Sequence, residues 1–196
     1  MNRERIMNRR NFLSLTAGNL LATNYIMTNS VTKPEVFYFK DGGSIPNSKY
    51  PMLVYRNAFN ERGDEGASWL EQRFGDNDWS NSWRNGIFSF HHYHSITHEV
   101  LGIYSGSALV QMGGEEGKRL TIQAGDIIVI PAGVGHKNLE SGDLGVVGAY
   151  PGGMMYDMNY GKEGERPQAD KNIAAVAIPN TDPLLGKNYG LPGIWK

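Results

Sequence analysis

The histidines are the residues of this chain whose positions point most directly to chemistry. All five lie between His91 and His136, and four of them fall within residues 91–98. Side chains alternate between the two faces of an extended strand, so His92 and His94 are expected to point the same way. Two imidazoles on one face are positioned to bind one transition-metal ion together.

A carboxylate and a third imidazole follow at spacings that could bring them to the same place. Glu99 comes five residues after His94, an odd spacing that would put it on the opposite face of a continuous strand, so we expect a break around residues 95–97. His136 follows an apolar run, Pro131 and two glycines, which let the chain bend back toward a shared interior. Three neutral imidazoles and one carboxylate suit divalent Fe, Mn, Ni, Cu or Zn better than Ca or Mg.

Two motifs around these residues resemble the two sequence signatures of the cupin superfamily. The first, G-x5-H-x-H-x3–4-E-x6-G, is matched at every fixed position by Gly86, His92, His94, Glu99 and Gly106. The second, G-x5-P-x-G-x2-H-x3-N, is matched by Gly125, Pro131, Gly133 and His136. Its last position differs, because Glu140 stands where the family has Asn, and Asn138 lies two residues earlier. Two signatures in the expected order make the resemblance specific.

The resemblance implies an all-β fold, an antiparallel jelly-roll (cupin) barrel. It also implies that the metal ligands are His92, His94, Glu99 and His136, with other positions on the ion left to water or substrate. From about Val36 to the C-terminus the chain is similar to the YjlB-like single-domain cupins, a group without an assigned activity. A homodimer is expected by the same resemblance.

Two classes of function are compatible with such a site. In the first, the chain is a metalloenzyme acting on a small organic molecule, and we favour dioxygenase-like oxidation modestly over isomerase or epimerase chemistry at a polarised carbonyl. In the second, it is a non-catalytic cupin that binds or senses a small ligand through the metal. No motif assigns a substrate.

Arg84 and His98 are further candidates for catalysis. Arg84 could bind a substrate carboxylate with two hydrogen bonds, although we prefer pairing with an acidic neighbour such as Asp76 or Asp78. His98 could orient a ligand or act as a general base, but we favour a turn residue without a catalytic role. His91 is expected to point outward.

Several large side chains near the motifs have less specific interpretations. Trp79, Trp83 and Phe88 are expected in the core or an interface. Tyr93 adjoins the histidines but has the wrong strand parity for their pocket. The tail methionines, Met154, Met155 and Met158, are expected to fill gaps.

The elements that must position these residues are mostly short strands. Strands are expected at residues 36–39, 52–55, 87–94, 99–104, 108–112, 119–122, 126–130 and 144–150. Strands at intervals of roughly 8–12 residues are typical of a sandwich or barrel. One helix is expected before the barrel, between Gly63 and Gly75, with a capping box from Ser68 to Glu71. The tail from Gly152 is expected to form an irregular wrap, with a strand or short helix at residues 174–178.

Composition narrows the function classes. The 196 residues carry a net charge of −1, which argues against a nucleic-acid partner. No apolar run reaches the ~18–20 residues of a membrane-spanning helix. The chain has no cysteine, which excludes disulfides, zinc ribbons, iron–sulfur clusters and thiol nucleophiles. We expect a single domain over residues 31–196 with a small-molecule partner.

The first 30 residues are typical of an export signal. The string from Arg9 and Arg10 to Leu13 resembles a twin-arginine signal, and a moderately apolar segment follows it. No A-x-A cleavage site is visible, and either Met1 or Met7 could be the start. We therefore expect export to the periplasm if this leader functions, and a cytoplasmic location otherwise.

Overall fold

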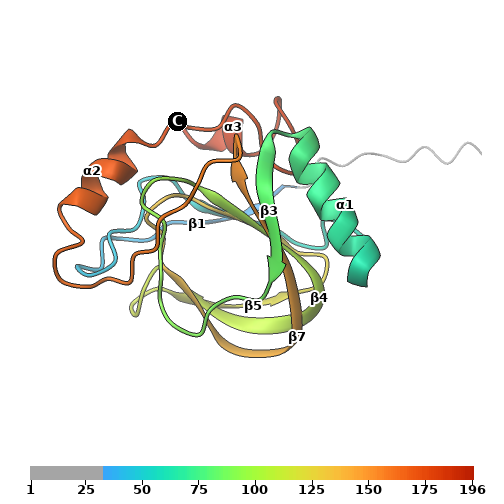
Figure 1. The fold of residues 1–196 in the computed structure, drawn as a ribbon, viewed down its shortest axis with the longest axis horizontal. Coiled ribbons are helices and arrows are strands. Elements are labelled where there is room, and N and C mark those ends of the chain that lie inside the picture. The colour runs from blue at the N-terminus through green and yellow to red at the C-terminus, as the bar shows by residue number, and fades with distance from the viewer. Residues whose placement is uncertain (1–32) are drawn as a thin grey trace, which may run out of the picture. The chain divides into compact units, whose positions relative to one another are not determined.

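A computed structural model describes residues 33–196, so the predicted leader lies outside the described residues. The strands are β1 (Glu35–Phe37), β2 (Met52–Tyr55), β3 (Trp79–Asn85), β4 (Glu99–Met112), β5 (Lys118–Gln123), β6 (Ile127–Ile130) and β7 (His136–Pro151). The helices are α1 (Gly63–Asp76), α2 (Gln168–Ala175) and α3 (Leu191–Ile194). The strands curve around a common interior, with the helices outside them (Figure 1).

All strand pairs are antiparallel, in the order β1-β2-β6-β4-β7-β3, with β5 paired to β4. β1 and β3 end this order, so the hydrogen bonding does not close around the barrel. The antiparallel pairing and the predominance of strands confirm the predicted jelly-roll fold, with a sheet that stays open between β1 and β3. Within the described residues, no helix is long and apolar enough to cross a membrane.

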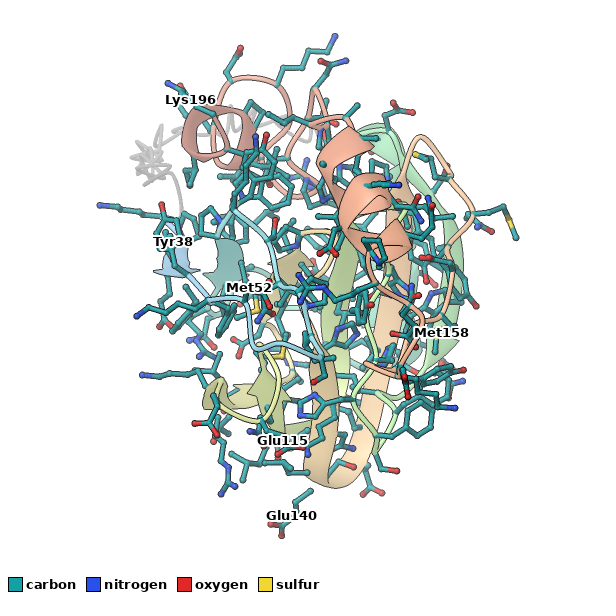
Figure 2. The ribbon with its side chains drawn as sticks, turned by 90° about the vertical axis from the view of Figure 1, so that its left-hand side faces the viewer. Tyr38, Met52, Glu115, Glu140, Met158 and Lys196 are labelled. Atoms are coloured by element: carbon teal, nitrogen blue, oxygen red, sulfur yellow. The ribbon has the colours of Figure 1, made fainter. Side chains whose placement is uncertain are left out.

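Strands β2 and β6 are buried on both faces, and each face of β2 packs against a different layer. Along β2, Met52 and Val54 belong to the cluster inside the barrel, whereas Leu53 and Tyr55 belong to the cluster that includes helix α1 and the tail. Figure 2 shows Met52 among the strands. In β4, Leu101 is in the inner cluster. Because faces alternate along a strand, Glu99 also points into the barrel.

β4 is one strand of 14 residues, so the prediction of two separate strands was wrong. Gly106 lies between the two predicted segments and has φ +66°, and a Cβ there would lie 2.3 Å from the carbonyl oxygen of Gly142. The pairing of β4 with β7 shifts register around this glycine. A bulge bends the strand without ending it, which explains why the first motif closes on glycine.

β7 begins at His136, eight residues before the predicted start at Leu144. Its first half is polar and largely exposed, with the pattern of a turn, but it pairs with the second half of β4. Glu140, the departure from the second motif, is exposed and lies at the lower end of the ribbon in Figure 2, where β7 pairs with β4. The presence of Glu140 in place of Asn therefore does not affect the contacts of the histidines.

The expected strand at residues 87–94 does not form. The segment is irregular, and its only ladder contacts are single bridges from His92 to His136 and from Tyr93 to Asn159. One bridge is to the start of β7 and the other is to the C-terminal tail. The chain is thus extended at the histidines because two distant segments bind its backbone on either side.

Helix α1 also differs from the prediction at its N-terminus. It begins at Gly63, and Ser68 lies inside it and donates a hydrogen bond to the carbonyl of Asp64, so the predicted capping box was wrong. Its buried face places Leu70 against β4, where a Cβ on Gly102 would lie 2.4 Å from the Leu70 side chain.

Buried hydrogen bonds fix the C-terminal tail to the barrel. The Asp182 carboxylate is fully buried and accepts hydrogen bonds from the Tyr55 hydroxyl and from the backbone N–H of Leu184 and Leu191. The predicted element at residues 174–178 is instead α2, which ends at Ala175.

Candidate metal centre

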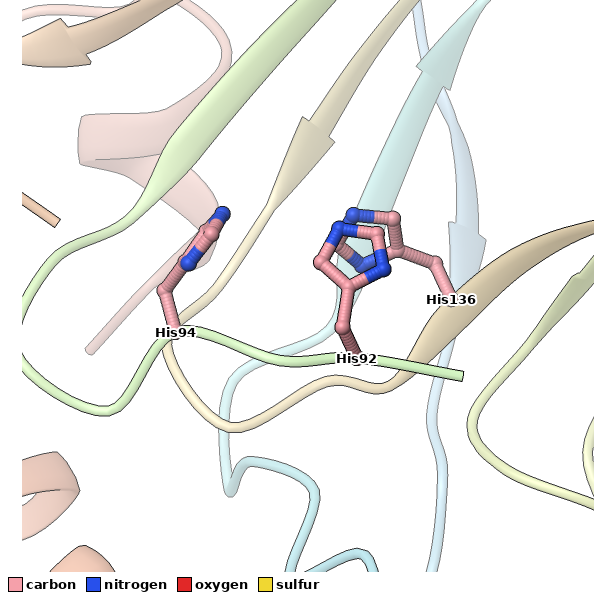
Figure 3. A group of neighbouring side chains, drawn as sticks. All are labelled: His92, His94 and His136. Carbon is pink, nitrogen blue, oxygen red and sulfur yellow. The ribbon is translucent and has the colours of Figure 1, made fainter. Parts of the chain in front are cut away.

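Three imidazoles converge on one point. His92 and His94 come from the segment between β3 and β4, and His136 begins β7. One ring nitrogen from each lies within 4.8 Å of the other two, and all three side chains are buried. Figure 3 shows the three rings grouped, with His92 close to His136, at a centroid distance of 4.1 Å.

Glu99 joins this group at the start of β4. Its Oε1 atom lies 3.5 Å from Nε2 of His94, and its Oε2 atom lies 3.4 Å from Nε2 of His136. The carboxylate is buried, and Oε2 has no hydrogen-bond partner among the described residues. A buried charged oxygen without a partner is costly, so a cation beside it would remove an unfavourable feature of this structure.

The second nitrogen of each imidazole faces a backbone carbonyl. The pairs are His92 Nδ1 with Phe90 O at 3.4 Å, His94 Nδ1 with Asp157 O at 2.5 Å and His136 Nδ1 with Val134 O at 3.2 Å. A carbonyl only accepts hydrogen bonds, so these contacts favour the tautomer with the proton on Nδ1. Each Nε2 is then left with a lone pair for a metal ion, as metal-binding histidines require.

The break predicted at residues 95–97 is a bend at Ser95 and Ile96. The carboxylate of Asp157 fixes it, accepting hydrogen bonds from the backbone N–H of Ser95 at 2.6 Å and of Ile96 at 3.3 Å, and from the Ser95 hydroxyl. Asp157 therefore holds both the His94 ring and the turn that brings Glu99 inward.

Two aromatic side chains hold the other side of the carboxylate. The Tyr150 hydroxyl donates to Oε1 of Glu99 at 3.1 Å, and the indole N–H of Trp83 donates to the Tyr150 oxygen at 2.8 Å. Burial, followed by the charge of Glu99, raises the pKa of Tyr150, so the phenol keeps its proton and remains a donor.

The electrostatics of the group favour an ionised carboxylate beside basic nitrogens. Burial acts to raise the pKa of Glu99, but His94 and His136 outweigh it and the pKa is lowered. Burial acts to lower the pKa of His94, but the charge and hydrogen bonding of Glu99 outweigh it and the pKa is raised. Burial and then His136 lower the pKa of His92 to about 3, so its ring is neutral near pH 7.

This geometry can be compared with known proteins. No protein-family model matches the chain. The uncharacterised protein YjlB of Bacillus subtilis (strain 168) is 47% identical over 163 residues, which cover 82% of this chain and 96% of the relative. The chain belongs to the YjlB-like family of cupins.

Solved structures similar to parts of this cupin have lower identity. An acireductone dioxygenase from Bacillus anthracis with cadmium in its active centre is 17% identical, with a TM-score of 0.37 over 50% of this chain and 76% of that chain. A DUF861 family protein from Thermotoga maritima is 24% identical, with a TM-score of 0.29 over 50% of this chain and 96% of that chain. An oxalate decarboxylase variant from Bacillus subtilis is 20% identical, with a TM-score of 0.33 over 59% of this chain and 29% of that chain.

The four side chains of this cupin border a cavity of about 380 Å³. Its other lining residues are Asn81, Ser82, Trp83, Arg84, Asn85, Gly86, Ile87, Phe88, Leu101, Tyr150, Met155, Tyr156 and Met158. Trp79 is fully buried, as expected, but Trp83 and Phe88 line the cavity. Met154 is 46% exposed and Met155 is 71% exposed, so the prediction that the tail methionines fill gaps was wrong for these two residues.

Arg84 lines the same cavity, but its guanidinium already binds a carboxylate. Two of its nitrogens lie 2.9 and 2.7 Å from the oxygens of Glu71 on helix α1, and Asp64 is 4.0 Å away. The prediction that Arg84 pairs with an acidic residue is therefore confirmed, but its partner is Glu71 and neither Asp76 nor Asp78.

His98 points away from the other histidines. Its Nδ1 accepts a hydrogen bond from the backbone N–H of Ala132 at 2.9 Å, and its ring packs against Trp195. It lines a separate cavity of about 250 Å³. Its pKa is lowered to about 4 by burial.

His91 and Tyr93 also point away from the metal centre, as their strand parity predicted. Nε2 of His91 lies 3.3 Å from Glu115, outside the cavity. Tyr93 is buried against Ile45 and donates its hydroxyl to Glu165.

Sequence reasoning missed three residues that shape this centre: Tyr150, Tyr156 and Asp157. Tyr150 carries a weak signal, since its parity in β7 matches that of Val146 in the inner cluster. Tyr156 and Asp157 lie in an irregular segment rich in Gly, Met and Asn, where no periodic pattern indicates which side chains face inward.

Proposed function

We propose that this cupin is a metalloenzyme that binds one divalent transition-metal ion and oxidises a small organic molecule with dioxygen. The ligands are His92, His94, Glu99 and His136. When bound, the ion supplies a Lewis-acidic centre with open positions for substrate and dioxygen. The observation that carries the proposal is the convergence of three imidazoles and a buried, unpartnered carboxylate oxygen on one cavity.

The chain holds the donor atoms ready before an ion arrives. Backbone carbonyls fix the imidazole rings, so little reorganisation accompanies binding. Tyr150 occupies Oε1 of Glu99, which leaves Oε2 for the ion. Leu101 and Ile87 border the same cavity and reduce the access of water to the donor atoms.

The composition of the cavity favours oxidation over isomerase or epimerase chemistry. Moving a proton between carbons needs a base beside the substrate. Among the described residues that line the cavity, the only carboxylate and imidazoles are the four proposed ligands, and there is no lysine. Arg84 remains charged, and the raised pKa of Tyr150 keeps its phenol protonated, so that the phenol cannot accept a proton from the substrate.

The test measures bound metal first and turnover second. The protein is purified without chelator, analysed for metals, loaded with Fe(II) and supplied with thiols, catechols, diketones and sugars while oxygen consumption is followed. We expect one metal per chain and substrate-dependent oxygen uptake that His94→Ala abolishes with the fold intact. Tight ligand binding without turnover would instead identify a binding or sensor cupin.

A further inference from the structure

Two half-exposed aromatic rings flank the imidazoles at the cavity. The ring of Phe88 lies 5.3 Å from that of His92 and is 50% exposed, and the ring of Tyr156 lies 5.0 Å from that of His94 and is 42% exposed. Both residues line the cavity. Large apolar side chains left open to solvent around a cavity mark a binding surface.

Neighbouring aromatic residues support both rings. Phe90 stacks on Phe88 with centroids 4.9 Å apart, and Tyr150 stacks on Tyr156 with centroids 5.0 Å apart. A supported ring offers contact area at a small cost in conformational entropy, because little side-chain freedom remains to be lost. The two supported rings therefore suit a flat, apolar ligand.

The charges around the cavity disfavour an anionic group on that ligand. Arg84 is the one cationic side chain among the described residues that line the cavity, and Glu71 occupies it with two hydrogen bonds. Asp64 lies 4.0 Å from the same guanidinium. Two carboxylates around one guanidinium leave this part of the rim with net negative charge, which repels an anion.

We infer that the substrate is an uncharged molecule with a flat, ring-sized apolar body and an oxygen donor that reaches the metal. The inference rests on the proposed function, because the donor needs the ion as its partner. Phe88 and Tyr156 hold the body of the molecule, and they determine specificity without touching the metal.

The test compares two probes that differ in one group, 4-methylcatechol and 3,4-dihydroxybenzoate. The full chain is loaded with Zn(II), which has no redox chemistry and leaves the probes intact. Dissociation constants are measured by titration calorimetry, and zinc content is checked afterwards. We expect 4-methylcatechol to bind at least about tenfold more tightly, since the carboxylate of the other probe meets a rim of like charge.

Substitution of the rings tests their role. Phe88→Ala and Tyr156→Ala should each weaken 4-methylcatechol binding by about three- to tenfold, the size of an aromatic contact. Tyr38→Ala is the matched control, because Tyr38 is 70% exposed and does not line the cavity. Equal affinity for the two probes, or equal effects of the three variants, would overturn the inference about the substrate and leave the proposed metal binding intact. A chain that retains no zinc would overturn the proposed function as well.

Discussion

The backbone carbonyl oxygen of Asp157 lies 2.5 Å from Nδ1 of His94, although the two residues are 63 positions apart in the chain. The carboxylate of the same residue accepts hydrogen bonds from Ser95 and Ile96. One residue of the C-terminal segment thus sets both the orientation of an imidazole and the bend after it. The segment after the last strand therefore helps to position the candidate metal ligands.

Replacing Asp157 should weaken metal binding even though its side chain is not a ligand. Without the carboxylate, the backbone N–H groups at the bend lose their acceptor, and the backbone carbonyl that contacts the His94 ring is no longer anchored at its present position. We expect Asp157→Ala to lower metal affinity by about 10- to 100-fold, measured by competition with a chelator. Asp157→Asn keeps one acceptor oxygen, so its metal affinity should lie between those of the wild type and Asp157→Ala. If both variants bind metal with the affinity of the wild type, the Asp157 carboxylate is not needed to keep the bend at Ser95 and Ile96.

Two buried tyrosines donate to buried carboxylates, and they should respond differently to loss of the hydroxyl. Tyr150 contacts Glu99 at the metal centre, whereas Tyr55 contacts Asp182 in the tail. We expect Tyr150→Phe to reduce metal affinity by about tenfold, because Glu99 loses a group that orients it. Tyr55→Phe should lower the free energy of unfolding by about 1–3 kcal/mol and leave the affinity unchanged. Thermal melts and chelator competition on both variants separate the two effects.

The convergence of four side chains could be predicted because the information is local. The strand parity of His92 and His94, the break before Glu99 and the glycines before His136 each depend on a few neighbouring residues. Short apolar segments separated by turns predicted a sandwich or barrel, and the resemblance to cupins implied the jelly-roll. These features survive even where the predicted strand at residues 87–94 is absent.

The rest of the centre depends on contacts between distant segments. Asp157 lies in a segment without periodicity, so nothing in its neighbours indicates that it faces His94. The first half of β7 has the polar sequence of a turn, and only its pairing with β4 shows that it is a strand. Gly106 likewise has the pattern of a turn, but a strand passes through it with a bulge.

Adjacent histidines offer a matched test of the ligand assignment. His92 points to the centre and His91 points to Glu115. We expect His92→Ala to lose bound metal and the thermal stabilisation that metal confers, since binding to the folded state alone raises stability. His91→Ala should keep both. Metal content unchanged in His92→Ala would count directly against the assignment.

The lowered pKa of His98 predicts how the metal-free protein responds to acid. The unfolded chain protonates this imidazole below about pH 6.5, whereas the folded chain protonates it only below about 4. Between these values the unfolded state binds more protons, so stability falls as pH falls, by up to about 1.4 kcal/mol per pH unit from this group. His98→Asn should reduce the slope of unfolding free energy against pH by about that amount between pH 6 and 4. Denaturant titrations at several pH values measure it, and an unchanged slope would exclude His98 as a source.

The first 30 residues support a prediction about location. We propose that they direct export, because two arginines precede a polar residue, Phe12 and Leu13, and an apolar segment follows. Fusing residues 1–34 to a reporter should carry it into the periplasm of a bacterial host, and replacing both Arg9 and Arg10 with Lys should keep it inside. Lysine preserves the charge, so a difference between the two fusions would show that the arginine pair itself is recognised. A reporter that stays inside with the unaltered segment would reject the export role.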